Sequence, residues 1–276
     1  MPSLHVPARP RAGVYTRICS PQSEPLRHLE VGLLSIEDPG EEWHTETGDR
    51  ELVIDIFSGK CTVRVEGPGG DAHFPEIGIR PTVFAGRPTL VYASRDSRVH
   101  LFADQTPMAA AVAFAPARDV HPAAFVHPEE TVVRSVGQGN WRRTVVTGVG
   151  DNVRADRLIV GETINPPGNW SSYPPHKHDA YGPGEEPMEE VYLYRLDPPT
   201  GFGIQRVYTA ADDPAPFDQT LVVRDGDAVV VPRGYHPVVG APGYSLFYLW
   251  VLAGDSRKYG AWADDPQHAW VKEGSA

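Results

Sequence analysis

Cysteine is scarce in this sequence, and basic residues are outnumbered by acidic ones. Only Cys19 and Cys61 occur in 276 residues, which is too few for a disulfide framework and favours a reducing compartment. Lysine and arginine number 25 against 36 aspartates and glutamates, giving a net charge of -11. Without a basic stripe to neutralise phosphates, neither nucleic acid nor an anionic membrane is expected as a partner.

Long apolar runs are also missing. The most apolar stretch, residues 246–253, is far shorter than the roughly 20 residues that a membrane-spanning helix needs. Residues 1–10 lack the apolar core of a secretory signal. Together these absences predict a cytoplasmic protein. If the substrate is an acid, its site must supply a local cation, because the chain as a whole carries the same sign of charge.

Proline and glycine are abundant, which favours strands over long helices. The chain has 28 prolines and 27 glycines, with 41% apolar and 22% charged residues. Turn residues at short intervals between alternating apolar runs predict the many short strands of an all-β sandwich or barrel. Residues 108–115 fit either a buried strand or a short helix, since periodicity does not separate the two. The length allows two domains of ordinary size or one large all-β unit.

The strand pattern is interrupted once, at residues 118–141, which we interpret as a bridge between two halves. Each half has a strand bounded by glycine, a Gly/Pro loop and a later turn containing proline, which indicates an internal duplication. The first half has no His-x-His and no Glu in register with one, so no metal ligands are expected there. Residues 1–25, rich in Pro and Arg, are expected to form an arm on the surface or against a partner, which allows a homo-oligomer.

Histidine and glutamate gather in the second half. His176 and His178 are two residues apart, and in an extended strand both imidazoles project from the same face. Glu190 opens a later alternating segment and can bring a carboxylate to the same pocket. His236 follows the strand and tight turn of residues 226–235, which would aim it inward. Three imidazoles and one carboxylate suit a divalent transition metal such as Zn, Mn or Fe and leave coordination positions open for substrate.

Two neighbouring carboxylates compete for the fourth ligand position. Strand alternation puts Glu190 on the same face as Tyr192 and puts Glu189 on the opposite face. We therefore predict Glu190 as the ligand. Lys177 lies between the two histidines and should point away from them, which favours a structural role.

The spacing of these residues resembles the paired motifs of the cupin superfamily, a small β-barrel with a metal bound inside. One motif is Gly-x5-Pro-x-Gly-x-His, from Gly226 to His236, and the other is His-x-His followed by Glu-Val-Tyr. The spacing departs from the common pattern twice. Eleven residues separate His178 from Glu190 where many cupins have three or four, and one residue separates Gly234 from His236 where two are usual.

Three longer stretches narrow the resemblance. Residues 169–179, 201–209 and 231–238 are similar to the 5-deoxy-glucuronate isomerase family of myo-inositol catabolism, and the similarity covers most of residues 140–260. It implies a bicupin, with two double-stranded β-helix barrels: residues 1–140 without metal ligands and residues 141–276 with the metal. It also implies interconversion of 5-deoxy-D-glucuronate, an aldehyde, and 2-deoxy-5-keto-D-gluconate, a ketone. A related uronate isomerase family shares this plan and the same ligand types.

An aldose-ketose isomerase removes a proton from the carbon next to a carbonyl and must hold the resulting enediolate. The base could be Glu190, a tyrosine on the same face, or a hydroxide on the metal. Arg206 could bind the substrate carboxylate with its planar fork, or it could be a solvated strand residue. Tyr173, Tyr192 and Tyr248 could bind sugar hydroxyls, or they could be aromatic side chains that fill the barrel.

Two other functions fit the same residues. Three histidines and one glutamate also suit iron, so a metal-dependent dioxygenase is the first alternative, and uptake of oxygen would identify it. The second is a cupin that binds or stores a sugar acid without turnover, for which the complete ligand set would not be needed. The completeness of the set favours the isomerase.

Overall fold

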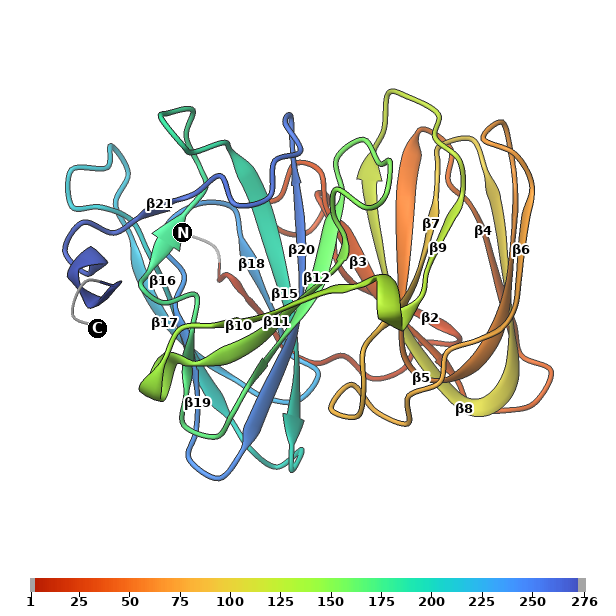
Figure 1. Ribbon diagram of the computed structural model, residues 1–276, viewed down its shortest axis with the longest axis horizontal. Coiled ribbons are helices and arrows are strands. Elements are labelled where there is room, and N and C mark those ends of the chain that lie inside the picture. The colour runs from red at the N-terminus through yellow and green to blue at the C-terminus, as the bar shows by residue number, and fades with distance from the viewer. Residues whose placement is uncertain (1–2, 273–276) are drawn as a thin grey trace.

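The computed structural model of the protein describes residues 3–272 and is all-β, as predicted. Within this range, twenty-one strands are joined by turns and by three short 3-10 helices, η1 (Pro128–Glu130), η2 (Gly139–Trp141) and η3 (Ala269–Lys272). Figure 1 shows two β-rich halves side by side, with the earlier part of the chain in one and the later part in the other. Within the described residues, no helix has the length and apolar character to cross a membrane.

The first half is one strongly bent sheet. Its two long central strands, β5 and β8, pair along most of their length. Register shifts between Ile56 and Cys61 let this pair bend back over itself. The segment that could have been a helix, residues 108–115, lies in one of these strands. The sheet order is β2-β3-β8-β5-β7-β9, with β4 on β8 and β6 on β5. The strands are β2 (Tyr15–Cys19), β3 (Glu30–Ile36), β4 (Glu42–Glu46), β5 (Arg50–Glu66), β6 (Ala72–Ile77), β7 (Thr89–Ala93), β8 (Arg98–Pro116) and β9 (Ala124–Val126).

The second half is built from a large sheet, a smaller one and a two-stranded ribbon. Their orders are β1-β18-β15-β20-β12-β11-β10, β13-β19-β16-β17 and β14-β21. The strands are β1 (His5–Val6), β10 (Val132–Val136), β11 (Arg143–Val149), β12 (Ile159–Asn165), β13 (Trp170–Ser171), β14 (His176–Lys177), β15 (Met188–Asp197), β16 (Gly203–Tyr208), β17 (Asp218–Val223), β18 (Ala228–Val231), β19 (Val238–Gly240), β20 (Ser245–Gly254) and β21 (Ala263–Asp264).

The arm predicted for residues 1–25 is described from residue 3 onward, and residues 3–25 do not form it. Strand β1 pairs with β18 of the second half, with His5 opposite Val229, and β2 pairs with β3. Leu4 and Ile18 are almost completely buried. The arm prediction is therefore wrong, because its few apolar residues are buried in the core and its backbone completes two sheets. Strand β9 belongs to the sheet of the first half, and β10 belongs to the large sheet of the second half. The division of the chain at residue 140 stays a prediction.

Residues 51–57 of strand β5 are buried on both faces, as their nearly continuous apolar sequence requires. Leu52 and Ile54 point into the barrel of the first half, where they join a purely apolar cluster. Val53 points the other way and joins a core cluster that also contains Val191 and Val251 of the second half. The two large sheets thus pack against each other, and apolar side chains fill the barrel of the first half.

The contact between the halves is reciprocal. Glu189 of β15 accepts hydrogen bonds of 2.7 to 2.8 Å from three consecutive backbone N–H groups of residues 27–29. Glu51 of β5 does the same, at 2.7 Å, with three N–H groups of residues 156–158. Each glutamate is the second residue of its strand. By this correspondence, Leu52 in the first half stands where Glu190 stands in the second.

Replacing Glu189 with alanine is expected to lower the free energy of unfolding by about 3 to 5 kcal/mol. The substitution leaves three backbone N–H groups without an acceptor, and hydrogen bonds to a charged group are each worth roughly 1.5 to 3 kcal/mol without being additive. Urea unfolding measures the change. Glu186→Ala, which removes one bond from Ser256, is the control and should cost less than about 1.5 kcal/mol. Equal unfolding midpoints for the two variants would contradict a stabilising role for the three hydrogen bonds to Glu189.

Candidate metal centre

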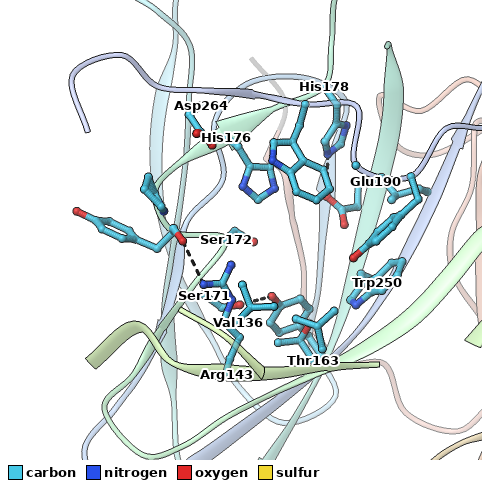
Figure 2. Close-up of a pocket in the computed structure, with 18 of the residues that line it drawn as sticks. Val136, Arg143, Thr163, Ser171, Ser172, His176, His178, Glu190, Trp250 and Asp264 are labelled. Atoms are coloured by element: carbon cyan, nitrogen blue, oxygen red, sulfur yellow. Dashed lines mark hydrogen bonds and ion pairs between the residues drawn. The ribbon is translucent and has the colours of Figure 1, made fainter. Parts of the chain in front are cut away.

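Three side chains from separate parts of the second half meet inside its barrel. His178 follows β14, Glu190 lies on β15, and His236 lies in the turn between β18 and β19. Their nearest donor atoms all lie within 4.8 Å of one another, and all three residues are buried. Figure 2 shows His178 and Glu190 facing each other at one end of a cavity. Nitrogen and carboxylate oxygen donors at this spacing form a candidate metal centre.

Backbone carbonyls fix both imidazoles. Nδ1 of His178 lies 2.6 Å from the carbonyl oxygen of Met188, and Nδ1 of His236 lies 2.9 Å from that of Gly234. Because Nδ1 donates to the carbonyl, each neutral ring presents an Nε2 lone pair, and each Nε2 lies 3.2 Å from Oε2 of Glu190. Nε2 of His236 is buried and has no hydrogen bond. The two Nε2 atoms and Oε2 of Glu190 are three acceptors that converge on one point, and such a group needs a cation. The residues therefore fit a metal ion.

His176 stands beside this group on β14. Its ring centre lies 4.9 Å from that of His236 and 6.3 Å from that of His178, while His178 and His236 are 5.1 Å apart. A metal ion sits about 2.1 Å from a ligating nitrogen, so the ring centres of two imidazoles on one ion lie at most roughly 6.5 Å apart. All three separations satisfy this limit. The arrangement therefore has room for His176 as a further ligand.

The pKa values of Glu190 and His176 shift in the direction that metal binding needs. Burial opposes the charge on Glu190, but the hydrogen bonds and charge that protonated His178 and His236 would supply outweigh it and lower the pKa of Glu190; burial also opposes a charge on His178, but its pairing with Glu190 raises the pKa of His178. Burial, with the nearby charges of His236 and His178, lowers the pKa of His176 well below its usual value. An ionised carboxylate and a neutral imidazole are the forms that bind a metal ion.

The centre opens into a cavity of about 300 Å³, the size of a small-molecule site. Aromatic rings make much of its wall: Trp250 stacks on Tyr259 with ring centres 5.3 Å apart, and Trp262 stands against His176 at 5.1 Å. Hydroxyl groups line another part of the same wall. Ser171 is hydrogen-bonded to Tyr248, and Ser172 lies 2.8 Å from the hydroxyl of Tyr192. A ligand with several hydroxyl groups fits such a lining.

The chain matches the KduI/IolB family model over residues 5–271. It belongs to that family. A 5-deoxy-glucuronate isomerase of Geobacillus thermodenitrificans is 38% identical over 235 residues, which cover 85% of this chain and 83% of that protein. A 5-deoxy-glucuronate isomerase of Bacillus subtilis strain 168 is 36% identical over 251 residues, covering 90% and 89%.

Solved structures agree with the family assignment. An IolB-like protein from Salmonella typhimurium LT2 superposes with a TM-score of 0.90 at 32% identity, covering 98% of this chain and all of that one. An oxalate decarboxylase of Lactobacillus farciminis superposes with a TM-score of 0.66 at 11% identity, covering 94% and 88%. The second likeness concerns the fold alone, and it confirms the predicted cupin architecture of this KduI/IolB chain.

Three of the four residues predicted to contact substrate line the cavity, namely Tyr173, Tyr192 and Tyr248. Arg206 does not. Its guanidinium forms a fork with both carboxylate oxygens of Asp218, at 2.9 and 2.5 Å, and its side chain is 43% exposed on β16. This position corrects the prediction for Arg206, because an acidic neighbour of the same chain already occupies its fork outside the cavity.

The neighbours of the metal centre lie where strand alternation puts them. Lys177 points away from the two imidazoles and binds Asp179 and Glu185 at 2.6 and 2.8 Å. Glu189 faces the first half and clamps its backbone. In this KduI/IolB protein, therefore, Glu190 is the carboxylate that the structure brings to the histidines.

Sequence reasoning missed Arg143, which lines the cavity of this KduI/IolB protein and is buried. Its sequence context, Trp-Arg-Arg at 141–143, gives no sign of which arginine points inward. The only signal was indirect: an acidic chain that binds an acid needs a local cation. The aromatic wall residues Trp250 and Trp262 were missed for the same reason, since nothing in their spacing relates them to the histidines.

Proposed function

We propose that this protein is a metal-dependent isomerase that interconverts 5-deoxy-D-glucuronate and 2-deoxy-5-keto-D-gluconate in myo-inositol catabolism. One observation carries the proposal: His178, Glu190 and His236 converge in a cavity of a chain that matches relatives named 5-deoxy-glucuronate isomerase over most of its length. Both cysteines are buried and unpaired, which supports a reducing cytoplasm as the place of action.

We assign His176, His178, Glu190 and His236 as the metal ligands. The donor set is three imidazoles and a carboxylate, which suits Zn, Mn or Fe. When bound, the metal supplies Lewis acidity that polarises a carbonyl oxygen and stabilises negative charge developing on it. The hydrogen bonds from His178 and His236 to backbone carbonyls hold the rings in the orientation that ligation requires.

The reaction moves one proton from the hydroxyl-bearing carbon to the neighbouring aldehyde carbon, and the hydroxyl proton passes to the former aldehyde oxygen. Glu190 is the proposed base, because every described polar contact of its carboxylate uses Oε2 and this leaves Oε1 to take the proton. The hydroxyls of Tyr192 and Tyr248, each supported by a serine, are placed to bind the sugar hydroxyls. The aromatic wall excludes water, which strengthens these polar contacts and protects the enediolate.

Removing the metal is expected to stop the reaction. In proton NMR with 5-deoxy-D-glucuronate in deuterium oxide, the metal-loaded protein should form the ketose with solvent deuterium at the carbon that gains the proton. Protein treated with a chelator should retain less than about 1% of this rate, since Lewis-acid stabilisation is worth several kcal/mol, and should recover when metal is restored.

Two results would overturn the proposal. One is turnover at the parent rate after complete removal of metal, and the other is absence of ketose from the metal-loaded protein. An oxygen electrode run on the same samples tests the dioxygenase alternative, because isomerisation consumes no oxygen.

A further inference from the structure

Arg143 is a buried cation at the far end of the cavity from the metal centre. It begins β11, is only 8% exposed and lines the cavity. Figure 2 shows its side chain rising from the strand toward Ser171 and Ser172, with His176, His178 and Glu190 at the opposite end. The cavity therefore has a positive group at one end and the candidate metal centre at the other.

The guanidinium of Arg143 is only partly satisfied. Nη1 donates to the carbonyl oxygens of Trp141 and Tyr173, at 3.2 and 3.1 Å. Nε is buried and has no hydrogen bond, and among residues 3–272 no described bond uses Nη2. No carboxylate of the described chain lies within ion-pair distance of it. An arginine has five N–H donors, so much of this fork is free for a ligand.

The other buried arginines of the described chain have acidic partners. Arg80 binds Glu162 and Asp55, and Arg157 binds Asp255 at 2.8 Å. Burying a charge without a partner costs several kcal/mol, and an arginine does not escape the cost by losing its proton. Arg143 thus lacks the counter-ion that this protein gives its other two buried arginines. A cavity ligand with a carboxylate would provide it.

We infer that Arg143 binds the carboxylate of the substrate and thereby sets which end of the sugar acid meets the metal centre. This rests on the proposed function, in which the substrate has its aldehyde at one end and its carboxylate at the other. The hydroxyl groups on the carbons between the two ends are then bound by the hydroxyls of Ser171, Ser172, Tyr192 and Tyr248. Arg143 thus selects a sugar acid over a neutral sugar of the same shape.

Another arginine of the cavity wall provides the matched control. Arg134 lies on the edge strand β10 and lines the same cavity, but it is exposed to solvent. An exposed charge gains little from an ion pair in water, whereas removing one partner of a buried, hydrogen-bonded pair costs 2 to 5 kcal/mol or more. The comparison between the two positions therefore separates a general attraction for anions from binding at a specific site.

The test compares two substrates and two variants. The substrates are 5-deoxy-D-glucuronate and 5-deoxy-D-glucose, which has a hydroxymethyl group in place of the carboxylate. Arg143→Met should lower kcat/KM for the acid by about 100-fold or more and leave kcat/KM for the neutral sugar within about threefold of the parent. Arg134→Met should change the ratio of the two by less than about fivefold. A large loss with Arg134→Met but not Arg143→Met would overturn the assignment.

Folding and metal content need separate checks, because Arg143 also supports the carbonyl of Tyr173. Thermal unfolding and metal analysis of each variant provide them. If Arg143→Met does not fold, Arg143→Lys replaces it, since lysine keeps the charge but loses the fork; the loss on the acid should then be about 10-fold, again without loss on the neutral sugar. Equal losses on both substrates would show a structural role and overturn the inference.

Calorimetry separates failure of this inference from failure of the proposed function. D-gluconate and its neutral counterpart D-sorbitol are titrated into metal-loaded and chelator-treated protein, without turnover. Binding of D-gluconate but not D-sorbitol, lost in Arg143→Met, supports the inference even if the parent protein has no isomerase activity. Parent protein that isomerises 5-deoxy-D-glucuronate but binds D-gluconate equally with and without Arg143 leaves the function intact and overturns the inference.

Discussion

His236→Ala is expected to abolish metal retention and to reduce isomerase activity by at least about 1,000-fold while the protein stays folded. His236 is one of the three residues whose donor atoms converge, and loss of mere supporting hydrogen bonds around a metal already costs 10- to 100-fold in affinity or activity. Metal content after dialysis and kcat/KM on 5-deoxy-D-glucuronate measure the effect. Circular dichroism checks the fold.

The matched control is His121→Ala, which removes an imidazole of the first half that lies outside the cavity and should leave metal content and activity unchanged. His176→Ala should also lose metal if His176 completes the ligand set as proposed. A purified His236→Ala protein that holds a full equivalent of metal and turns over substrate at the parent rate would disprove the metal centre.

Arg80→Met is expected to lower the free energy of unfolding by about 3 to 5 kcal/mol. Arg80 binds Glu162 of β12 at 2.5 and 2.8 Å and Asp55 of β5 at 3.2 Å, and all three are almost completely buried. Removing the cation leaves the charge of Glu162 buried beside Asp55 without a partner, and breaking a buried ion pair on one side costs about this much. Urea unfolding at pH 7 measures the change, and an unchanged midpoint would contradict it.

Asp55→Asn is the informative partner of that variant, because its expected effect depends on pH. Burial, followed by the charge of Glu162, raises the pKa of Asp55 well above its usual value. The folded state therefore holds this proton more tightly than the unfolded chain does. The resulting stability is fully present below the ordinary aspartate pKa of about 4 and is lost as the pH rises through the raised folded value.

The amide that Asp55→Asn introduces has no proton to lose, so the stability of this variant relative to the parent should increase with pH above about 4. At pH 8 the variant should be at least as stable as the parent protein. Unfolding curves at pH 5 and pH 8 for both proteins test this. If Asp55→Asn is instead several kcal/mol less stable than the parent at pH 8, Asp55 is ionised in the folded protein and acts as a second partner that Arg80 requires.

Much of the candidate metal centre could be predicted from local geometry. The choice of Glu190 over Glu189 needed only the alternation of a strand, because β15 is regular over its ten residues. The direction of Lys177 followed from the same rule. The residue types also predict no metal ligands in the first half, which stays a prediction, and the structure places Leu52 where Glu190 stands in the second half.

The opposite end of the cavity could not be predicted in this way. Arg206 and Arg143 are both strand arginines, and only the packing of β11, β12 and β20 decides that the second points into the barrel while the first meets Asp218 outside. A side chain's face is local, but whether that face is inside depends on which sheets close over it. The prediction of a surface arm was wrong for the same reason, since short segments such as β1 pair with a strand more than 200 residues away in the chain.

The sequence by itself determined the all-β class, the residue types of the candidate metal centre and the relation to the KduI/IolB family, because residue type and strand period are carried by neighbours in the chain. Only the tertiary structure decided how the metal centre and Arg143 stand at opposite ends of one cavity, and how Glu51 and Glu189 lock the halves together. These features depend on contacts between distant segments, which a packed core fixes and a local pattern does not encode.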